Sequence, residues 1–181
     1  MKQVEISNDV LVIDKSVVYK FLSENNVTDS LKDLYRYNNI NYPKFFKMDN
    51  LSKLGFLAAE HLLEGIDNKE DLGIILCTSS SSLETDAAFQ ETINDEANFF
   101  PSPSVFVYTL PNIVMGEICI RHQIHGENMM FIMNGNDREY FYEHASNLMY
   151  AMKLTTCIIG YLDCYQNNIK AYFRLYENYS S

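Results

Sequence analysis

The stretch from Leu110 to Gly135 constrains the fold of this chain more than any other part of the sequence. It opens with Leu-Pro-Asn, continues through Gly116, turns at Gly126 and ends in the largely apolar run Asn128 to Met133. That run has the length and the flanking turn residues of a fully buried strand, as found in parallel sheets. Gly116 would let its backbone approach another element closely. The stretch therefore predicts a closely packed helix followed by a buried strand.

Strand and helix patterns alternate through the rest of the chain. Alternating apolar and polar residues predict one or two short strands in Met1–Lys15, and Ser16–Glu24 is expected to form a short helical turn. Apolar residues at helical spacing predict helices at Thr28–Tyr37, Asp49–Glu64, Ser81–Asn98, Asn112–Arg121 and Asp137–Lys153. Further strands are expected at Leu72–Cys77, Asn128–Met133, Thr156–Cys164 and Ile169–Tyr176, the last two joined by a hairpin turn. This order predicts an α/β fold with a five-stranded, mainly parallel sheet whose last strand is antiparallel.

Local signals refine these elements. Asp49 is expected to cap its helix, and Ser81 and Glu84 have the spacing of a capping box, as do Asn136 and Glu139. Gly55 lies inside a helix, where glycine is unfavourable, and so indicates close packing at that point. The inward-facing residues are expected to be Leu83, Ala87, Ala88 and Ile93 in the helix after Ser81, and Phe141, Ala145, Leu148, Met149 and Met152 in the last helix. Between them, Phe99–Tyr108 is expected to be a loop, because it contains two prolines.

The net charge of −10 argues against two classes of partner, nucleic acids and anionic membrane surfaces, because both require a basic surface. The charge is uneven along the chain. Lys69 is the only basic residue between Glu60 and Glu96, whereas five basic residues lie between Lys32 and Lys53. The basic segment is interpreted either as ordinary solvated surface or as a patch for an acidic partner.

Composition favours one globular domain over residues 1–181, because 47% of the residues are apolar. The four cysteines, Cys77, Cys119, Cys157 and Cys164, form no C-x-x-C pair, and the first three lie in apolar runs, as buried free thiols do. A reducing cytoplasm suits that pattern. No signal peptide or membrane-length apolar run is visible, so we expect a cytoplasmic protein.

The residue types that carry catalysis occur without convincing spacing. His122 and His125 are three apart but have no third metal ligand nearby in sequence. Cys119 lies near His122, as a cysteine nucleophile and its base would, but burial within a helix would make the thiol inert. Ser79–Ser82 lacks the spacing and the lysine of a phosphate-binding loop. We therefore expect no catalytic, metal or cofactor site.

Several segments, in order, resemble the β-ketoacyl synthases of fatty-acid and polyketide synthesis, within the thiolase-like group. That family carries the pattern LPNxxAGxISIxxGLxGPxxxxxTAC, and the residues here in register with it are Leu110, Pro111, Asn112, Gly116, Ile118, Ile120 and Gly126. Lys47–Leu54 with Ala58-Ala59-Glu60, and Leu72–Thr78, resemble an earlier helix and strand of the family. The resemblance covers residues 45–163 and implies a single thiolase-like half: a five-stranded mixed sheet with helices on both faces.

One departure bears on activity. The family's strand ends on a cysteine that attacks an acyl thioester, and the corresponding position in this chain is Gly135. Glycine has no side chain and cannot act as a nucleophile. The family's two active-site histidines come from a second half that this sequence does not contain. The resemblance thus implies the fold without the chemistry.

Two functional hypotheses follow from the resemblance. The first is a non-catalytic partner or accessory protein of a bacterial fatty acyl or polyketide pathway, which acts by self-association or by pairing with a full-length synthase. The alternative is a binding or sensor module for an acyl or other apolar ligand in the vestigial substrate groove. An enzyme with a new site ranks below both.

The partners implied are a second copy of the chain, a full-length ketosynthase or an acyl carrier protein. In the family the strand corresponding to Asn128–Met133 pairs across a two-fold axis, so the expected dimer interface consists of Asn128, Met129, Met130, Phe131, Ile132 and Met133. A homodimer is expected when no other partner is present. Carrier proteins are typically acidic, and the expected docking residues for one are Lys44, Lys47 and Lys53.

Overall fold

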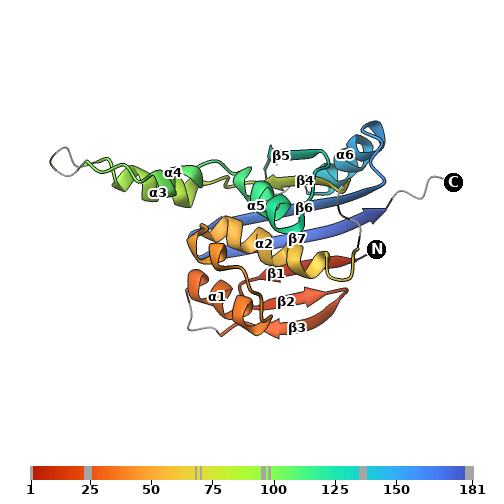
Figure 1. Ribbon diagram of the computed structural model, residues 1–181, viewed down its shortest axis with the longest axis horizontal. Coiled ribbons are helices and arrows are strands. Elements are labelled where there is room, and N and C mark those ends of the chain that lie inside the picture. Colours follow the sequence, from red (N-terminus) through yellow and green to blue (C-terminus); the bar gives the residue numbers. More distant parts are fainter. Residues whose placement is uncertain are drawn as a thin grey trace.

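A mixed β-sheet forms the centre of the molecule (Figure 1). The computed structural model describes residues 2–22, 26–67, 69, 71–94, 97, 99–134 and 138–177, and within these residues the sheet has seven strands in the order β3-β2-β1-β7-β6-β4-β5. The strands are β1 (Gln3–Ser7), β2 (Val10–Ile13), β3 (Ser16–Lys20), β4 (Gly73–Thr78), β5 (Asn128–Ile132), β6 (Thr156–Tyr165) and β7 (Asn168–Glu177). β4 runs parallel to β5 and β6, and the other neighbouring pairs are antiparallel.

The prediction of a mainly parallel sheet is therefore wrong, because four of the six described neighbouring pairs are antiparallel. The prediction of five strands is also wrong, and the N-terminal segment accounts for the difference. Met1–Lys15 supplies two strands, and Ser16–Glu24 begins with strand β3 instead of a helical turn. Asp14 and Lys15, with φ of 48° and 72°, form a two-residue turn of the kind that joins β2 to β3 as a hairpin. The β-branched Val17 and Val18 favour the extended conformation once β2 is available as a neighbour.

Helices cover both faces of the sheet, as expected. The helices are α1 (Val27–Tyr37), the 3-10 helix η1 (Pro43–Lys47), α2 (Asn50–Leu62), α3 (Leu83–Glu91), α4 (Pro103–Val107), α5 (Ile113–His122) and α6 (Arg138–Ala151). α1, α2 and α5 share one hydrophobic core with the sheet, whereas α6 packs on a second core on the opposite face.

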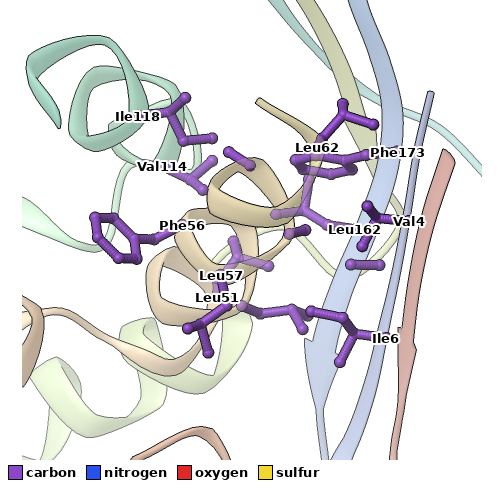
Figure 2. Packing of buried hydrophobic residues seen from close by; sticks show 14 of the residues in the cluster. Val4, Ile6, Leu51, Phe56, Leu57, Leu62, Val114, Ile118, Leu162 and Phe173 are labelled. Carbon is purple, nitrogen blue, oxygen red and sulfur yellow. The ribbon is translucent and has the colours of Figure 1, made fainter. Parts of the chain in front are cut away.

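Helix α2 lies at the centre of the larger core (Figure 2). Asp49 caps it, because its Oδ1 accepts a hydrogen bond of 2.9 Å from the backbone N–H of Ser52. The helix is apolar on nearly every side, as a helix enclosed by other elements must be. It packs between the strands, which contribute Val4, Ile6, Leu162 and Phe173, and helix α5, which contributes Val114 and Ile118.

The close packing predicted at Gly55 is confirmed. A Cβ added there would lie 2.3 Å from Val114 Cγ2 and 3.1 Å from Leu162 Cδ1, so glycine lets α2 approach both α5 and β6. The same prediction for Gly116 is wrong. Gly116 lies on the exposed side of α5, and an added Cβ would meet no atom within 4 Å.

The smaller core lies beneath α6. Phe141, Ala145 and Met149 are buried there as predicted, and Leu148 and Met152 are partly buried at its margin. These side chains cover the opposite face of β4 and β6, where Ile75, Cys77, Cys157 and Ile159 lie. The proposed cap at Asn136 lies outside the described residues.

The segment between β4 and α5 departs most from expectation. α3 begins at Leu83 and ends at Glu91, and Ser81 has a left-handed φ of 53°, which is incompatible with a capping box at that residue. Leu83, Ala87 and Ala88 are exposed instead of buried, and Ile93 is partly exposed. α4 forms within the expected loop, because Ser102 caps it and Pro103 suits its first turn.

Strand β5 is also more exposed than predicted. It forms one edge of the described sheet, with only β4 beside it, and it is half-buried instead of fully buried. By contrast, the β6–β7 hairpin is confirmed. Its turn is Gln166-Asn167, with φ of 50° and 63°, and ten pairs of residues align along the two strands.

Candidate functional site

The serine-rich turn after β4 is tied to one carboxylate, that of Asp163 on β6. Asp163 Oδ1 accepts hydrogen bonds from Thr78 Oγ1 at 2.9 Å and from the backbone N–H of Ser80 at 2.8 Å. Its Oδ2 accepts from Ser79 Oγ at 2.8 Å and from Ser80 Oγ at 2.9 Å. Burial alone would raise the pKa of Asp163, but these hydrogen bonds outweigh burial and lower it. Because an anion already occupies the donors, the turn serves the fold and is not available to a phosphate.

Three of the four cysteines have a raised thiol pKa. Cys77, Cys157 and Cys164 are buried, and Cys119 is half-buried on α5. Burial raises the pKa of Cys119, and it raises the pKa of Cys157 to about 12. The pKa of Cys164 is also raised, first by burial and then by the nearby Glu84 carboxylate. A thiol acts as a nucleophile only as its thiolate, so these surroundings oppose nucleophilic chemistry.

The histidines have structural neighbours. His122 Nε2 lies 3.2 Å from Glu60 Oε1, and Glu60 also accepts hydrogen bonds of 2.6 and 3.2 Å from Arg121. His61 Nε2 lies 2.8 Å from Asn38 Nδ2. Across the described part of the chain, no group of three or more His, Cys, Asp or Glu side chains is arranged to hold a metal ion. Gly135, which the sequence resemblance aligns with the nucleophile of β-ketoacyl synthases, lies outside the described residues.

The open edge of β5 is a candidate interaction surface. Ile74 N–H donates to Glu127 O, and Met133 N–H donates to Thr78 O, both at 2.9 Å. Because backbone groups alternate sides along a strand, Asn128, Met130 and Ile132 direct theirs away from β4. The Ile132 side chain is 62% exposed. The residues of the expected dimer interface are thus brought together at a free strand edge.

A second candidate surface was not predicted from the sequence. The described residues 83–94, 97 and 99–110, here called the arm, project from the sheet with α3 and α4 (Figure 1). Neither helix contains a buried residue. The arm's exposed large apolar residues are Leu83, Phe99, Phe100, Phe106, Val107 and Leu110. The signal that could have revealed it is the apolar cluster around Pro101 and Pro103, in a segment that lacks helical or strand periodicity.

A groove of about 790 Å³ lies between the start of the arm and the β6–β7 turn. The groove is lined by residues 26–28, Asn50, five residues of α3 and residues 165–167. It therefore opens near the carboxyl ends of β4 and β6, where α/β sheets commonly bind ligands. No lysine or arginine belongs to this lining, which combines the apolar Val27, Leu83 and Ala87 with amide and hydroxyl side chains and with the carboxylates of Glu84 and Asp86.

The predicted carrier-docking lysines have different surroundings. Lys44 forms an ion pair of 2.8 Å with Glu117, which is 4% exposed. Lys47 is exposed, whereas Lys53 is 5% exposed and is withdrawn from the surface. Lys32 and Arg36 pair with Asp29 and Asp33 on their own helix. A docking surface in this region would therefore consist mainly of Lys44 and Lys47.

The described helices include none that is long and apolar enough to span a membrane. No protein-family model and no curated protein matches the chain.

Comparison with solved structures identifies the fold. One similar structure is a chain of "the ishigamide ketosynthase/chain length factor", with a TM-score of 0.71 and 14% identity over 99% of this chain. Another is a chain of the complex between a ketosynthase (ApeO) and its chain length factor (ApeC) from Xenorhabdus doucetiae, with a TM-score of 0.71 and 11% identity over 98% of this chain. This chain spans 62% of the first and 77% of the second. The protein therefore has the thiolase-like fold of ketosynthase and chain length factor proteins.

Proposed function

We propose that the protein is a non-catalytic partner of a ketosynthase in a bacterial pathway that makes a polyketide or fatty acyl chain. The observation that carries this proposal is the open edge of β5, in a fold shared with ketosynthase and chain length factor proteins. An edge strand with free backbone groups and an exposed apolar side chain is a site for pairing with another chain. Gly135 at the nucleophile position supports a role without condensing chemistry.

The interface of this proposal is the strand Asn128–Met133. Phe131 lies across from Phe141 of α6, with ring centroids 6.1 Å apart, so a charge at Phe131 would disturb folding as well as pairing. Ile132 offers a cleaner change, because its side chain is exposed and its N–H points away from β4. Ile132→Pro removes that outward N–H and leaves the ladder with β4 in place. Ile132→Thr is the matched control, because it keeps the N–H in a β-branched residue.

The test is co-expression with the ketosynthase encoded nearest to this gene, followed by size-exclusion chromatography with light scattering. We expect a complex of the two chains with the natural protein and with Ile132→Thr, and separate chains with Ile132→Pro. Circular dichroism verifies that Ile132→Pro is folded. A complex that survives the proline substitution would refute the β5 interface, and two chains that never associate would refute the ketosynthase partnership.

The absence of condensing chemistry has its own measurement. Incubation with acyl thioesters, followed by intact-protein mass spectrometry, should leave the chain unmodified, because Cys77 is buried and the pKa values of Cys119, Cys157 and Cys164 are raised. A stoichiometric acyl adduct would contradict the proposal, and Cys119 is the first residue to map.

An acyl carrier protein is a further proposed partner. Docking would use Lys44 and Lys47, because the chain as a whole is acidic and would repel an acidic carrier elsewhere. The Lys44→Glu/Lys47→Glu double variant should abolish docking. Titration at increasing salt concentration measures it. Because Lys44 pairs with Glu117, folding of the variant is checked first.

The second candidate function is ligand binding, and the 790 Å³ groove is the observation that favours it. Its lining of apolar, amide, hydroxyl and carboxylate side chains suits an uncharged acyl chain that carries amide groups, such as octanoyl-pantetheine. Calorimetric titration tests this. Ala87→Arg should block the groove, whereas Ala88→Arg, also exposed on α3 but outside the lining, should not.

A further inference from the structure

The base of the arm is held firmly to the body of the protein. Thr85 Oγ1 donates to Asp49 Oδ2, and Asn50 Nδ2 donates to Glu84 Oε1, both at 3.0 Å. The returning limb is fixed where Tyr108 OH donates to Glu117 Oε1 at 3.0 Å. These contacts join the arm to the N-terminal end of α2 and to α5. These contacts therefore fix the orientation of the arm relative to α2 and α5.

The two limbs of the arm also contact each other. The rings of Phe89 and Phe106 lie 5.4 Å apart, and Phe100 N–H donates to Thr92 O at 3.2 Å. Ser82 Oγ donates to Thr109 O at 2.5 Å where the limbs meet the body. These contacts leave the apolar side chains directed outward, with Phe100 74% exposed and Phe106 53% exposed. Exposed aromatic residues on a preorganised support are characteristic of interaction surfaces.

Charge limits what can cover this surface. Every charged residue between Gly73 and Ile120 is acidic. Glu91 is exposed on α3, and Glu84 and Asp86 precede it on the same helix. Two arms packed against each other would therefore bring like charges together, which disfavours a second copy as the occupant.

Four basic residues of this chain are already engaged, because Lys32, Arg36, Lys44 and Arg121 pair with Asp29, Asp33, Glu117 and Glu60. Lys47 is exposed, so arm-to-body contact between two copies is distinguished by experiment, as a concentration-dependent change at the arm. The repulsion between two acidic arms favours a different protein as the occupant.

We infer that the arm docks into an apolar hollow rimmed by lysine or arginine on a partner protein, with Phe100 and Phe106 as its anchors. This inference deepens the proposed function and rests on it for the class of partner, a ketosynthase. It adds a contact separate from the β5 edge, and it assigns the arm to a heterologous partner and not to self-association.

The composition of the chain permits a direct test, because it contains no tryptophan. Phe100→Trp places the only tryptophan at the exposed part of the arm, and Tyr150→Trp places one on α6, where the tyrosine is 77% exposed. The probes are three synthetic amphipathic helical peptides free of tryptophan and tyrosine. They share a leucine face and carry lysine, glutamine or glutamate on the opposite face.

We expect the lysine peptide to shift the emission of the Phe100→Trp protein to shorter wavelength, with an affinity at least about tenfold above that of the glutamate peptide. The affinity should fall as salt rises. The Tyr150→Trp protein should show no shift. Adding Phe106→Ser to Phe100→Trp should weaken binding about tenfold, because half of the apolar anchor is removed.

Three results would overturn the inference. Equal binding of the lysine and glutamate peptides would remove the role of charge. An equal response at Tyr150→Trp would indicate attraction to the acidic protein as a whole. A concentration-dependent shift of Phe100→Trp without peptide would identify a second copy as the occupant.

The co-expressed ketosynthase separates this inference from the proposed function. Phe100→Ser/Phe106→Ser should weaken that complex, whereas Tyr150→Ser should not. If the complex forms and the arm substitutions have no effect, the arm inference fails and the proposed function stands. If the lysine peptide binds the arm but no ketosynthase associates with the chain, the arm's chemistry stands and the proposed function fails.

Discussion

Gly55 and Gly116 occupy the interiors of two helices with opposite surroundings. An added Cβ at Gly55 would lie 2.3 Å from Val114 Cγ2, whereas at Gly116 it would meet nothing within 4 Å. Gly55→Ala should therefore lower the free energy of unfolding by about 1–3 kcal/mol through overpacking. Gly116→Ala should raise it by about 0.5–1 kcal/mol, because alanine favours the helix. Urea denaturation of both variants provides the measurement, and equal effects would contradict the packing described here.

Glu60 gives the protein a specific acid sensitivity. Burial alone would raise its pKa, but the adjacent His122 and the hydrogen bonds from Arg121 outweigh burial and lower the pKa from the ordinary 4.5 to about 2. A lowered pKa in the folded state stabilises the protein above the unfolded value, and this stability is lost as the pH falls from 4.5 toward 2. The contribution at neutral pH is at most about 3 kcal/mol.

Glu60→Gln should therefore be less stable than the natural protein at pH 5, and the difference should shrink as the pH approaches 2. Urea denaturation across this range measures it. Glu64→Gln is the control, because Glu64 is exposed and its described contact is made by its backbone carbonyl. Parallel pH profiles for the Glu60→Gln and natural proteins would show that the ion pair does not contribute.

At the scale of elements, the β6–β7 hairpin depends on a turn with two left-handed residues. Gln166 has a φ of 50°, a conformation that a branched or long side chain adopts at some cost. Gln166→Gly should raise the thermal unfolding temperature, equivalent to about 0.5–1 kcal/mol, because glycine adopts this conformation freely. Asn168→Gly, just inside β7, should lower it, because glycine weakens a strand. Calorimetry of the pair tests the turn, and destabilisation by Gln166→Gly would contradict it.

At the scale of the whole molecule, the net charge and the open β5 edge have opposite effects on self-association. Without a partner, the open edge favours a homodimer, whereas a net charge of −10 on each copy disfavours association. Salt should therefore strengthen self-association by screening this repulsion. Light scattering should give an apparent mass that rises with salt toward twice the 21.0 kDa chain mass. A mass that falls with salt would contradict pairing through the neutral β5 edge.

The sheet face opposite α2 carries polar side chains on β1 and β7. In β1, the buried Val4 and Ile6 alternate with Gln3, Glu5 and Ser7, which are partly exposed and polar. On the neighbouring β7, the Arg174 guanidinium lies 4.7 Å from the centre of the Tyr172 ring, on the same side as α6. The polar residues of β1 suit contact with water. This part of the sheet face is therefore polar and not apolar.

The sequence alone determined the elements whose signals are local. Apolar spacing and the Asp49 cap are enough to predict α2, and a continuous apolar run between turn residues is enough to predict β4. The β6–β7 hairpin was also predictable, because its strands and turn are adjacent in the chain. The close packing at Gly55 followed from the cost of glycine inside a helix.

Only the tertiary structure decided features that depend on partners distant in sequence. Ser16–Lys20 becomes a strand because β2 lies beside it, and β5 is an open edge because the described sheet ends there. Asp163 holds the serine turn across more than 80 residues of chain. The arm is the same kind of case: its residues are apolar enough for a core, and only the path of the chain shows that they remain outside it. Local periodicity records which residues avoid water, but not which surface covers them.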